Sequence, residues 1–394
     1  MRASKLTFTG LVAALLLAAC GGGDPEVPGS GAPAGAPTTK GTFTALVTFG
    51  DSLSDIGTYT PATSVTGNGA APYIGGKFTT NSATGTVWVE NLAATMGVTV
   101  TPAEVGFAGV SQKCPAAAVP ALASTCTAYG QGGSRVTDPN GINHAAGALT
   151  VPIVTQIANH HTRFGNFKDS DLILVYAGNN DVFAQFGAFA AAAAAIQAQA
   201  GAGAITPDQA NQQLFAAQTA AFEGMKTAAL ELAGYVRNEI LAKGGKYVAV
   251  MTISDIADTP FGNSAQVAPA RSVLTELSQI FNLWLREGLT GAPVQIVDTY
   301  TIFKQAYANP GALGFTNNTV PACDATKIAA ITSNAVTDGS SLFCNATTGL
   351  PYNGLRTGAD ATTWFFADSV HPTTGGHKAI SDTFTAQLRA FGWL

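Results

Sequence analysis

Four short and nearly uninterrupted apolar runs occur along the chain, at 43–49 (FTALVTF), 172–177 (LILVYA), 247–253 (YVAVMTI) and 294–297 (VQIV). Continuous, β-branched runs of this length are typical of strands that are buried on both faces of a sheet. Between them, apolar residues recur at helical spacing in the segments 87–96, 216–241 and 272–287. Because strands alternate with helices, the pattern predicts an α/β fold with a mostly parallel sheet and helices on both faces.

Two segments depart from this alternation. Residues 190–195 are six consecutive alanines, and we interpret them as part of a helix or a low-complexity surface insertion rather than as a membrane segment. Residues 311–358 are long and rich in Gly, Thr and Asn, which predicts a loop that covers or flanks a site.

The N-terminus has the layout of an export signal. A short basic segment precedes an apolar run, 6–19, that is too short to span a bilayer comfortably. The run ends in Leu-Ala-Ala-Cys, which resembles the lipobox of bacterial lipoproteins, in which the cysteine (here Cys20) receives lipid; an ordinary secretory signal with an incidental cysteine is the alternative. Gly21 follows, which in such lipoproteins implies delivery to the outer membrane where the host has two membranes. We therefore expect a signal peptide at 1–19, a lipid-anchored Gly/Pro/Ala tether at 20–41 and one folded domain at 42–394.

Composition narrows the function classes. Charged residues make up only 11% of the chain against 46% hydrophobic residues, so the surface is expected to be neutral and polar. The net charge is −5 and no basic run occurs, which argues against nucleic-acid binding. The many Val, Ile, Leu and Phe residues argue against disorder.

The cysteines also indicate export. Beyond Cys20 the chain has four, in two pairs that each lie within one loop-like stretch. We expect the local disulfides Cys114–Cys126 and Cys323–Cys344, formed in an oxidising compartment, although a pairing between the two loops remains open. No CxxC or HxxxH spacing occurs, so we expect no metal ion.

Four polar motifs carry candidate chemistry: GDSLSD at 50–55, GQGGSRV at 130–136, GNND at 178–181 and DSVH at 368–371. Open α/β sheets place their sites where strands end, and the first and third motifs directly follow apolar runs. Each motif alone is weak, since a serine more often caps a helix and an Asp-x-x-His pair is usually structural. The chain has no G-x-S-x-G motif, which argues against the α/β-hydrolase fold, and no phosphate-binding glycine loop.

Taken in this order, the four motifs resemble the GDSL family of SGNH hydrolases over residues 44–393. The longer segments 49–57 (FGDSLSDIG), 76–79, 87–90 and 254–260 are similar to the lipase and haemolysin-like branch of that family. The resemblance implies a three-layer α/β/α fold with a flavodoxin-like sheet, and a carboxylic ester hydrolase of the esterase or lipase type.

The resemblance also implies roles for individual residues. Ser52 would be the nucleophile, His371 the general base and Asp368 the carboxylate that orients the histidine ring. The oxyanion donors would be the N–H of Ser52, the N–H of Gly133 and the side chain of Asn180, with Gly132 as an alternative to Gly133. Asp51, Asp55 and Asp181 would act as structural anchors, and the histidines 144, 160, 161 and 377 would be structural or solvated.

The expected reaction is hydrolysis of an ester through an acyl-enzyme, which needs no metal or organic cofactor. Two alternatives remain: acyl transfer to an alcohol by the same residues, and a non-catalytic surface lipoprotein that binds glycans or other partners. We expect a monomer whose partners are an ester substrate and, through the N-terminal lipid, a membrane. The expected location is the bacterial outer membrane or cell surface.

Overall fold

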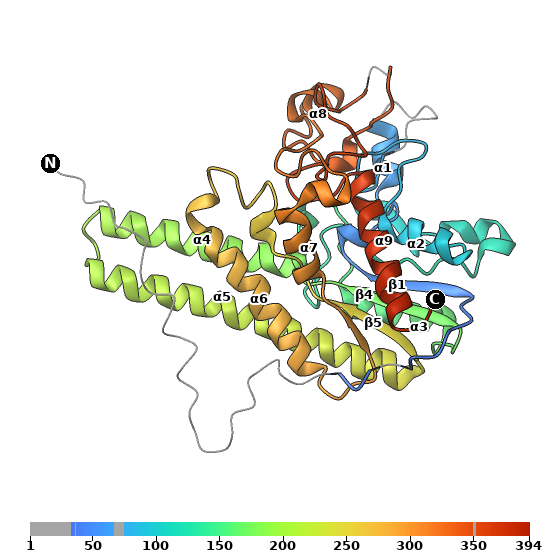
Figure 1. Cartoon of the computed structure of the whole chain (residues 1–394). Coiled ribbons are helices and arrows are strands. Elements are labelled where there is room, and N and C mark those ends of the chain that lie inside the picture. The colour runs from blue at the N-terminus through green and yellow to red at the C-terminus, as the bar shows by residue number, and fades with distance from the viewer. Residues whose placement is uncertain (1–32, 36, 67–74, 350–351) are drawn as a thin grey trace, which may run out of the picture.

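A parallel sheet of four strands forms the centre of the computed structural model, which describes residues 33–35, 37–66, 75–349 and 352–394 (Figure 1). The export signal and Cys20 lie outside these residues. The strands are β1 (Ala45–Gly50), β4 (Asp171–Tyr176), β5 (Tyr247–Met251) and β6 (Gln295–Val297), in the order β1-β4-β5-β6. Each strand begins and ends within two residues of the corresponding apolar run in the sequence, and nearly all of the strand residues are buried.

A further segment extends the sheet beyond β1. The N–H of Thr48 donates to the carbonyl of Thr127 at 3.0 Å, and the N–H of Tyr129 donates to the carbonyl of Thr48 at 2.8 Å, which forms a single parallel bridge. If the segment around Ala128 is counted as an edge strand beside β1, the strand order is that of the predicted flavodoxin-like sheet.

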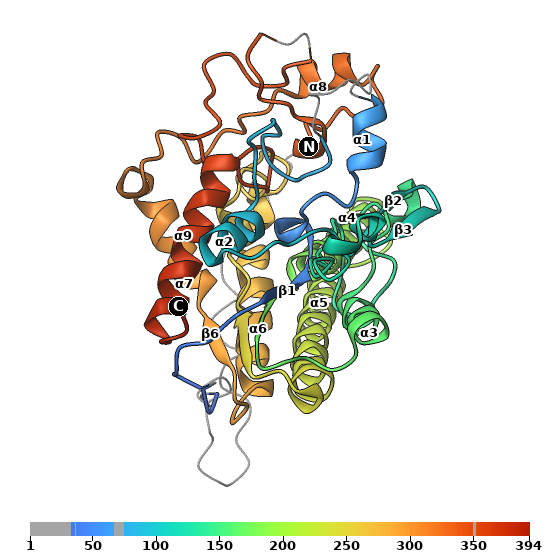
Figure 2. The same ribbon diagram turned by 90° about the vertical axis from the view of Figure 1, so that its right-hand side faces the viewer.

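Helices cover both faces of the sheet (Figures 1 and 2). On one face lie α2 (Trp88–Met96) and α9 (Thr374–Ala390), whose Trp88 and Phe384 rings are 4.9 Å apart. On the other face lie α3 (Ile153–Phe164), α5 (Pro207–Tyr235) and α6 (Arg271–Gly288). These layers confirm the predicted α/β/α architecture.

A long helical hairpin projects from the body (Figure 1). It consists of α4 (Asn179–Gly201), which contains the alanine run, and the outer part of α5. The sequence placed the start of this second helix at 216, but α5 begins at Pro207 because Thr206 and Gln209 form a reciprocal capping box. Among the described helices, α4 alone is long and apolar enough to cross a membrane, which is weak evidence because a helix packed in a protein core passes the same test.

Two smaller features were not foreseen. The hairpin of β2 (Glu104–Phe107) and β3 (Val110–Lys113) lies apart from the main sheet. The predicted loop at 311–358 follows α7 (Thr299–Ala308) and contains α8 (Ala325–Ile331), which forms because the Asp324 carboxylate caps its first turn. In Figure 2 this segment lies next to α1 (Thr60–Thr66) and above the sheet.

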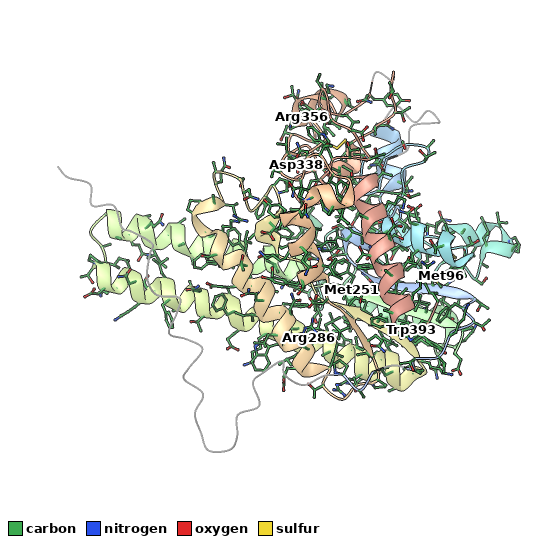
Figure 3. All side chains as sticks on the ribbon, viewed as in Figure 1. Met96, Met251, Arg286, Asp338, Arg356 and Trp393 are labelled. Carbon is green, nitrogen blue, oxygen red and sulfur yellow. A yellow bond between two sulfur atoms is a disulfide. The ribbon has the colours of Figure 1, made fainter. Side chains whose placement is uncertain are left out.

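The end of the predicted tether packs against the body. The Trp393 indole donates to the carbonyl of Pro37 at 2.5 Å, and the N–H of Gly41 donates to the carbonyl of Trp393 at 3.0 Å. Farther upstream, the N–H of Ala34 donates to the carbonyl of Ala292. Trp393 is fully buried, and Figure 3 labels it near the C-terminal end of α9. The ordered body therefore begins before residue 42.

Candidate active site

Ser52 lies directly after β1, on a short 3-10 turn at the carboxyl edge of the sheet. The Asp51 carboxylate accepts from the N–H of Leu53 at 3.0 Å and from the Asn179 amide at 2.9 Å. Because Asn179 is the first residue of α4, this carboxylate joins the serine turn to the end of the neighbouring strand. Asp51 thus has the anchoring contacts expected of it.

Gly50, the last residue of β1, connects the same turn to α3. Its N–H donates to Gln156 Oε1 at 3.0 Å, and its carbonyl accepts from Gln156 Nε2 at 2.9 Å. A side-chain carbon at Gly50 would lie 2.7 Å from the carbonyl oxygen of Tyr176, so only glycine fits between β1 and β4. Gln156 was missed in the sequence, where nothing distinguishes it from other polar residues of α3.

Three residues that are distant in sequence form one hydrogen-bonded chain. Ser52 Oγ lies 2.8 Å from His371 Nε2, and His371 Nδ1 lies 2.8 Å from Asp368 Oδ2. With the carboxylate accepting from Nδ1–H, Nε2 is left to accept the serine hydroxyl proton. The Phe78 ring lies 4.7 Å from the imidazole and restricts its movement. The three side chains make the hydrogen-bond contacts of a serine-hydrolase triad.

The Asp368 carboxylate is tightly held. Oδ1 accepts from the N–H groups of Val370 and His371 at 2.9 and 2.8 Å, and Oδ2 accepts from the N–H of Ser341 at 2.8 Å. Burial would raise the pKa of Asp368, but the positive charge of His371 and these hydrogen bonds outweigh it and hold the pKa well below the usual range. The carboxylate therefore stays ionised and fixed beside the ring.

In the glycine loop at 130–136, the N–H groups of the two candidate oxyanion donors, Gly132 and Gly133, differ in their hydrogen bonding. The N–H of Gly132 donates to Asp55 Oδ2 at 2.9 Å, so it is already engaged. The N–H of Gly133 has no acceptor within the described part of the chain. Gly133 also has φ +83°, and a side-chain carbon there would lie 2.2 Å from the carbonyl oxygen of Ile142. The geometry favours Gly133 as the free donor.

Asp55 ties this loop to the serine turn. Its Oδ1 accepts from the N–H groups of Gly57 and Thr58 at 2.9 and 2.7 Å, while its Oδ2 takes the N–H of Gly132. Burial raises the pKa of Asp55 to about 6 despite these hydrogen bonds. The carboxyl has all its contacts within the scaffold, as expected for an anchor.

The start of α4 is fastened to the same loop. Asn180 Nδ2 donates to the carbonyl of Ser134 at 2.9 Å, which leaves its second amide hydrogen for another acceptor. Asp181 accepts from Arg135 Nε and from the N–H of Val136, both at 3.0 Å, and burial raises its pKa to about 6. Gly133 and Asn180 therefore belong to one rigid unit.

Two of the other histidines, His160 and His377, are buried among groups of the scaffold. His160 is buried and stacked on Phe167 at 4.4 Å, and burial lowers its pKa to about 4. His377 is held between the N–H of Trp88 and the carbonyl of Phe78, and burial lowers its pKa to about 3. Within the residues that the structure describes, no three His, Cys, Asp or Glu side chains are placed to hold a metal ion.

Disulfides join Cys114 to Cys126 and Cys323 to Cys344. The second pair encloses Ser341, the residue that donates its N–H to Asp368. Sequence reasoning missed Ser341, although its position between two cysteines of a loop expected to flank the site was a usable signal. Asn81 steadies this loop from the other side by donating to the carbonyl of Ser341 at 2.9 Å.

The two disulfides should differ in their effect on catalysis. Replacing Cys323 and Cys344 together by serine should lower kcat about tenfold, because a looser loop no longer holds the Ser341 N–H on Asp368. The matched double variant of Cys114 and Cys126 should lose similar stability, about 3 kcal/mol by chain entropy, and keep its kcat. Thermal melts and kcat of both variants check this, and equal kcat losses would contradict it.

Comparison with protein families gives a match over most of the chain. A family model described as GDSL-like Lipase/Acylhydrolase matches residues 46–384. The matched range includes Ser52, Gly133, Asn180, Asp368 and His371. No curated protein matches the chain.

Proposed function

The chain belongs to the GDSL-like lipase/acylhydrolase family, and we propose that it is a serine esterase or lipase that cleaves carboxylic esters through an acyl-enzyme. The family indicates a hydrolase. The single observation that supports the more specific proposal is the hydrogen-bonded chain from Ser52 Oγ through His371 to Asp368, with both links at 2.8 Å. We further propose that the chain belongs to the lipase and haemolysin-like branch of the family. The support is the similarity of its segments 49–57, 76–79, 87–90 and 254–260 to that branch.

The proposed reaction follows from this geometry. Ser52 Oγ attacks the ester carbonyl carbon while its proton passes to His371 Nε2, and Asp368 stabilises the imidazolium that forms. The carbonyl oxygen becomes negative and accepts from the N–H groups of Ser52 and Gly133 and the Asn180 amide; loss of one such donor costs about 2.7–4 kcal/mol in comparable sites.

The remaining steps regenerate the enzyme. The tetrahedral intermediate collapses, the C–O bond to the alcohol breaks, and the leaving oxygen takes the proton from His371. Water then attacks the acyl-Ser52 ester with His371 again as base, which releases the acid. An alcohol in place of water would give acyl transfer by the same atoms.

A covalent probe tests the proposal. A fluorophosphonate should label the intact protein at Ser52, as located by peptide mass spectrometry, and p-nitrophenyl acetate should be hydrolysed. Product analysis with added alcohol measures the share of acyl transfer. A protein that neither labels nor turns over any ester would be a binding protein on this scaffold.

We also propose that the chain is exported and anchored by lipid on Cys20, with the catalytic domain following the tether. The support is the Leu-Ala-Ala-Cys sequence after the short apolar run. Cys20→Ser should yield either unprocessed precursor or a form without lipid, as read by mass spectrometry of the N-terminus. Wild-type protein cleaved elsewhere, with a free N-terminus, would contradict this.

Activity should fall on mild acidification. A protonated His371 cannot accept the Ser52 proton, so turnover should decline as the pH is lowered from about 8 to about 4. Asp368 remains ionised over this range because its pKa is held low, so the loss reports on the histidine. A profile of kcat/KM against pH checks this, and a rate that stays flat down to pH 4 would contradict a histidine base.

Stability should change much less over the same range. The raised pKa values of Asp55 and Asp181 mean that the folded state takes up their protons first, which adds stability as the pH falls through about 6. The lowered pKa values of His160 and His377 have the opposite effect below the ordinary histidine range. Asp368 loses its contribution only below the ordinary range of aspartate. Thermal melts at each pH separate the two effects.

A further inference from the structure

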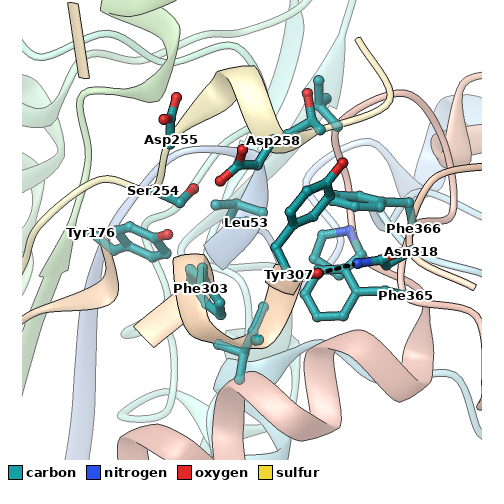
Figure 4. A pocket seen from close by; sticks show the side chains of 15 residues that line it. Leu53, Tyr176, Ser254, Asp255, Asp258, Phe303, Tyr307, Asn318, Phe365 and Phe366 are labelled. Carbon is teal, nitrogen blue, oxygen red and sulfur yellow. Dashed lines mark hydrogen bonds between the residues drawn. The ribbon is translucent and has the colours of Figure 1, made fainter. Parts of the chain in front are cut away.

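An apolar pocket lies at the carboxyl edge of the sheet (Figure 4), and Ser52, Asp368 and His371 are not among the residues that line it. Two of its lining residues are Leu53 and Val370, which adjoin Ser52 and His371 in sequence. Tyr176 and Ser254, at the carboxyl ends of β4 and β5, contribute further wall. The pocket therefore starts at the carboxyl edge of the sheet, where the nucleophile and the base are held.

One face of α7 forms the opposite wall. Phe303, Ala306 and Tyr307 line the pocket, and their spacing of three and four residues places them on the same side of the helix. Phe365 and Phe366, from the segment that leads to Asp368, line it as well. In Figure 4 the rings of Phe303, Tyr307, Phe365 and Phe366 lie below or to the right of Leu53.

The charged groups in the wall are already paired. Asp255 and Asp258 line the pocket, but Lys304 Nζ lies 2.6 Å from an oxygen of the first and 2.9 Å from one of the second. Arg271 lies 3.1 Å from the other oxygen of Asp258. A wall of aromatic and aliphatic carbon with neutralised carboxylates suits an uncharged apolar group and disfavours a charged one.

The size of the pocket limits what enters. Its volume is about 60 Å³, whereas one water molecule takes up ~30 Å³ in the liquid. The pocket therefore has room for a short apolar group and not for a long chain.

We propose that this pocket binds the acyl chain of the ester and selects short acyl groups. The proposal rests on the proposed esterase function. The acyl group stays attached to Ser52 after the alcohol has left, so a pocket lined by Leu53 and Val370, the chain neighbours of Ser52 and His371, would retain its occupant through both half-reactions. Phe303 and Ala306 set the room available on the α7 side.

Two substitutions on α7 test the proposal in opposite directions. Phe303→Ala should enlarge the pocket and move the optimum of kcat/KM at least two carbons towards longer p-nitrophenyl esters. Ala306→Phe should fill it and lower kcat/KM for the hexanoate tenfold or more, since one methylene in a pocket is worth about 10–200-fold. Ala308→Phe, on the exposed side of the same helix, is the matched control and should leave the profile unchanged.

The outcomes distinguish a failure of the pocket assignment from a failure of the proposed esterase function. Wild-type protein that reacts with a fluorophosphonate and hydrolyses the acetate, with the same chain-length profile in both variants, would overturn the pocket assignment and leave the esterase proposal standing. The variants could instead change the preference among acetates of different alcohols and leave the preference among acyl chains unchanged. That result would assign the pocket to the alcohol. A wild-type optimum at ten or more carbons would overturn the size limit. Absence of both labelling and turnover would overturn the two proposals together.

Discussion

Ser52→Ala should lower kcat for ester hydrolysis by on the order of 10⁴–10⁶ and abolish labelling by a fluorophosphonate. The reason is that the serine oxygen forms the covalent bond to the acyl group, and no other hydroxyl adjoins His371 Nε2 in the described residues. The fold should persist, because the hydroxyl contributes a single hydrogen bond to the histidine.

Ser369→Ala is the matched control, since Ser369 is exposed and lies between Asp368 and His371 in sequence. It should keep the wild-type kcat and labelling. Substantial turnover by purified Ser52→Ala, with a normal thermal melt, would refute the assignment of the nucleophile.

Asp368→Asn should lower kcat by about 10⁴, the loss seen when the carboxylate of such a triad becomes an amide. The amide removes the charge that stabilises the imidazolium, and its NH₂ group favours the wrong tautomer of His371. The substitution also disturbs the hydrogen bonds from Ser341 and Val370, so a stability loss of about 1–3 kcal/mol should accompany it.

Fluorophosphonate labelling of Asp368→Asn should be slow but still directed to Ser52, which distinguishes an impaired base from a lost nucleophile. Asp360→Asn, an exposed carboxyl in the same C-terminal region, should leave kcat unchanged. A wild-type rate in Asp368→Asn would mean that the 2.8 Å contact to His371 has no part in catalysis.

Much of the fold was readable because buried parallel strands leave an unambiguous trace. Strands β1, β4 and β5 have almost no exposed position, so their sequences are continuous apolar runs, and the residues that follow them are where open α/β sheets place their chemistry. The hairpin β2–β3 left no such trace, because every residue of Val110–Lys113 is exposed and no apolar alternation is required.

Features of the site that depend on tertiary contacts were not readable. The Ser341 N–H reaches Asp368 only because the disulfide-closed loop folds back over the sheet. The spacing of Phe303, Ala306 and Tyr307 is visible in the sequence, but the surface that this helix face meets is not. The sequence left Gly132 and Gly133 as alternatives, and what separates them is the carboxylate of Asp55, which lies 77 residues from Gly132 in the chain.

The packing of the N-terminal segment has a consequence for the direction in which the enzyme would face. Pro37 and Gly41 contact Trp393, whose ring lies 5.4 Å from that of Tyr247, the first residue of β5. The tether therefore joins the body at the amino edge of the sheet, whereas Ser52 lies at the carboxyl edge. With Cys20 lipidated as proposed, the 34 − 20 = 14 residues up to Ala34, which hydrogen-bonds to Ala292, extend at most ~50 Å, at ~3.3–3.6 Å each. The point of attachment and the catalytic site would then lie at opposite edges of the sheet, so that esters arriving by diffusion would reach Ser52 without passing the anchor.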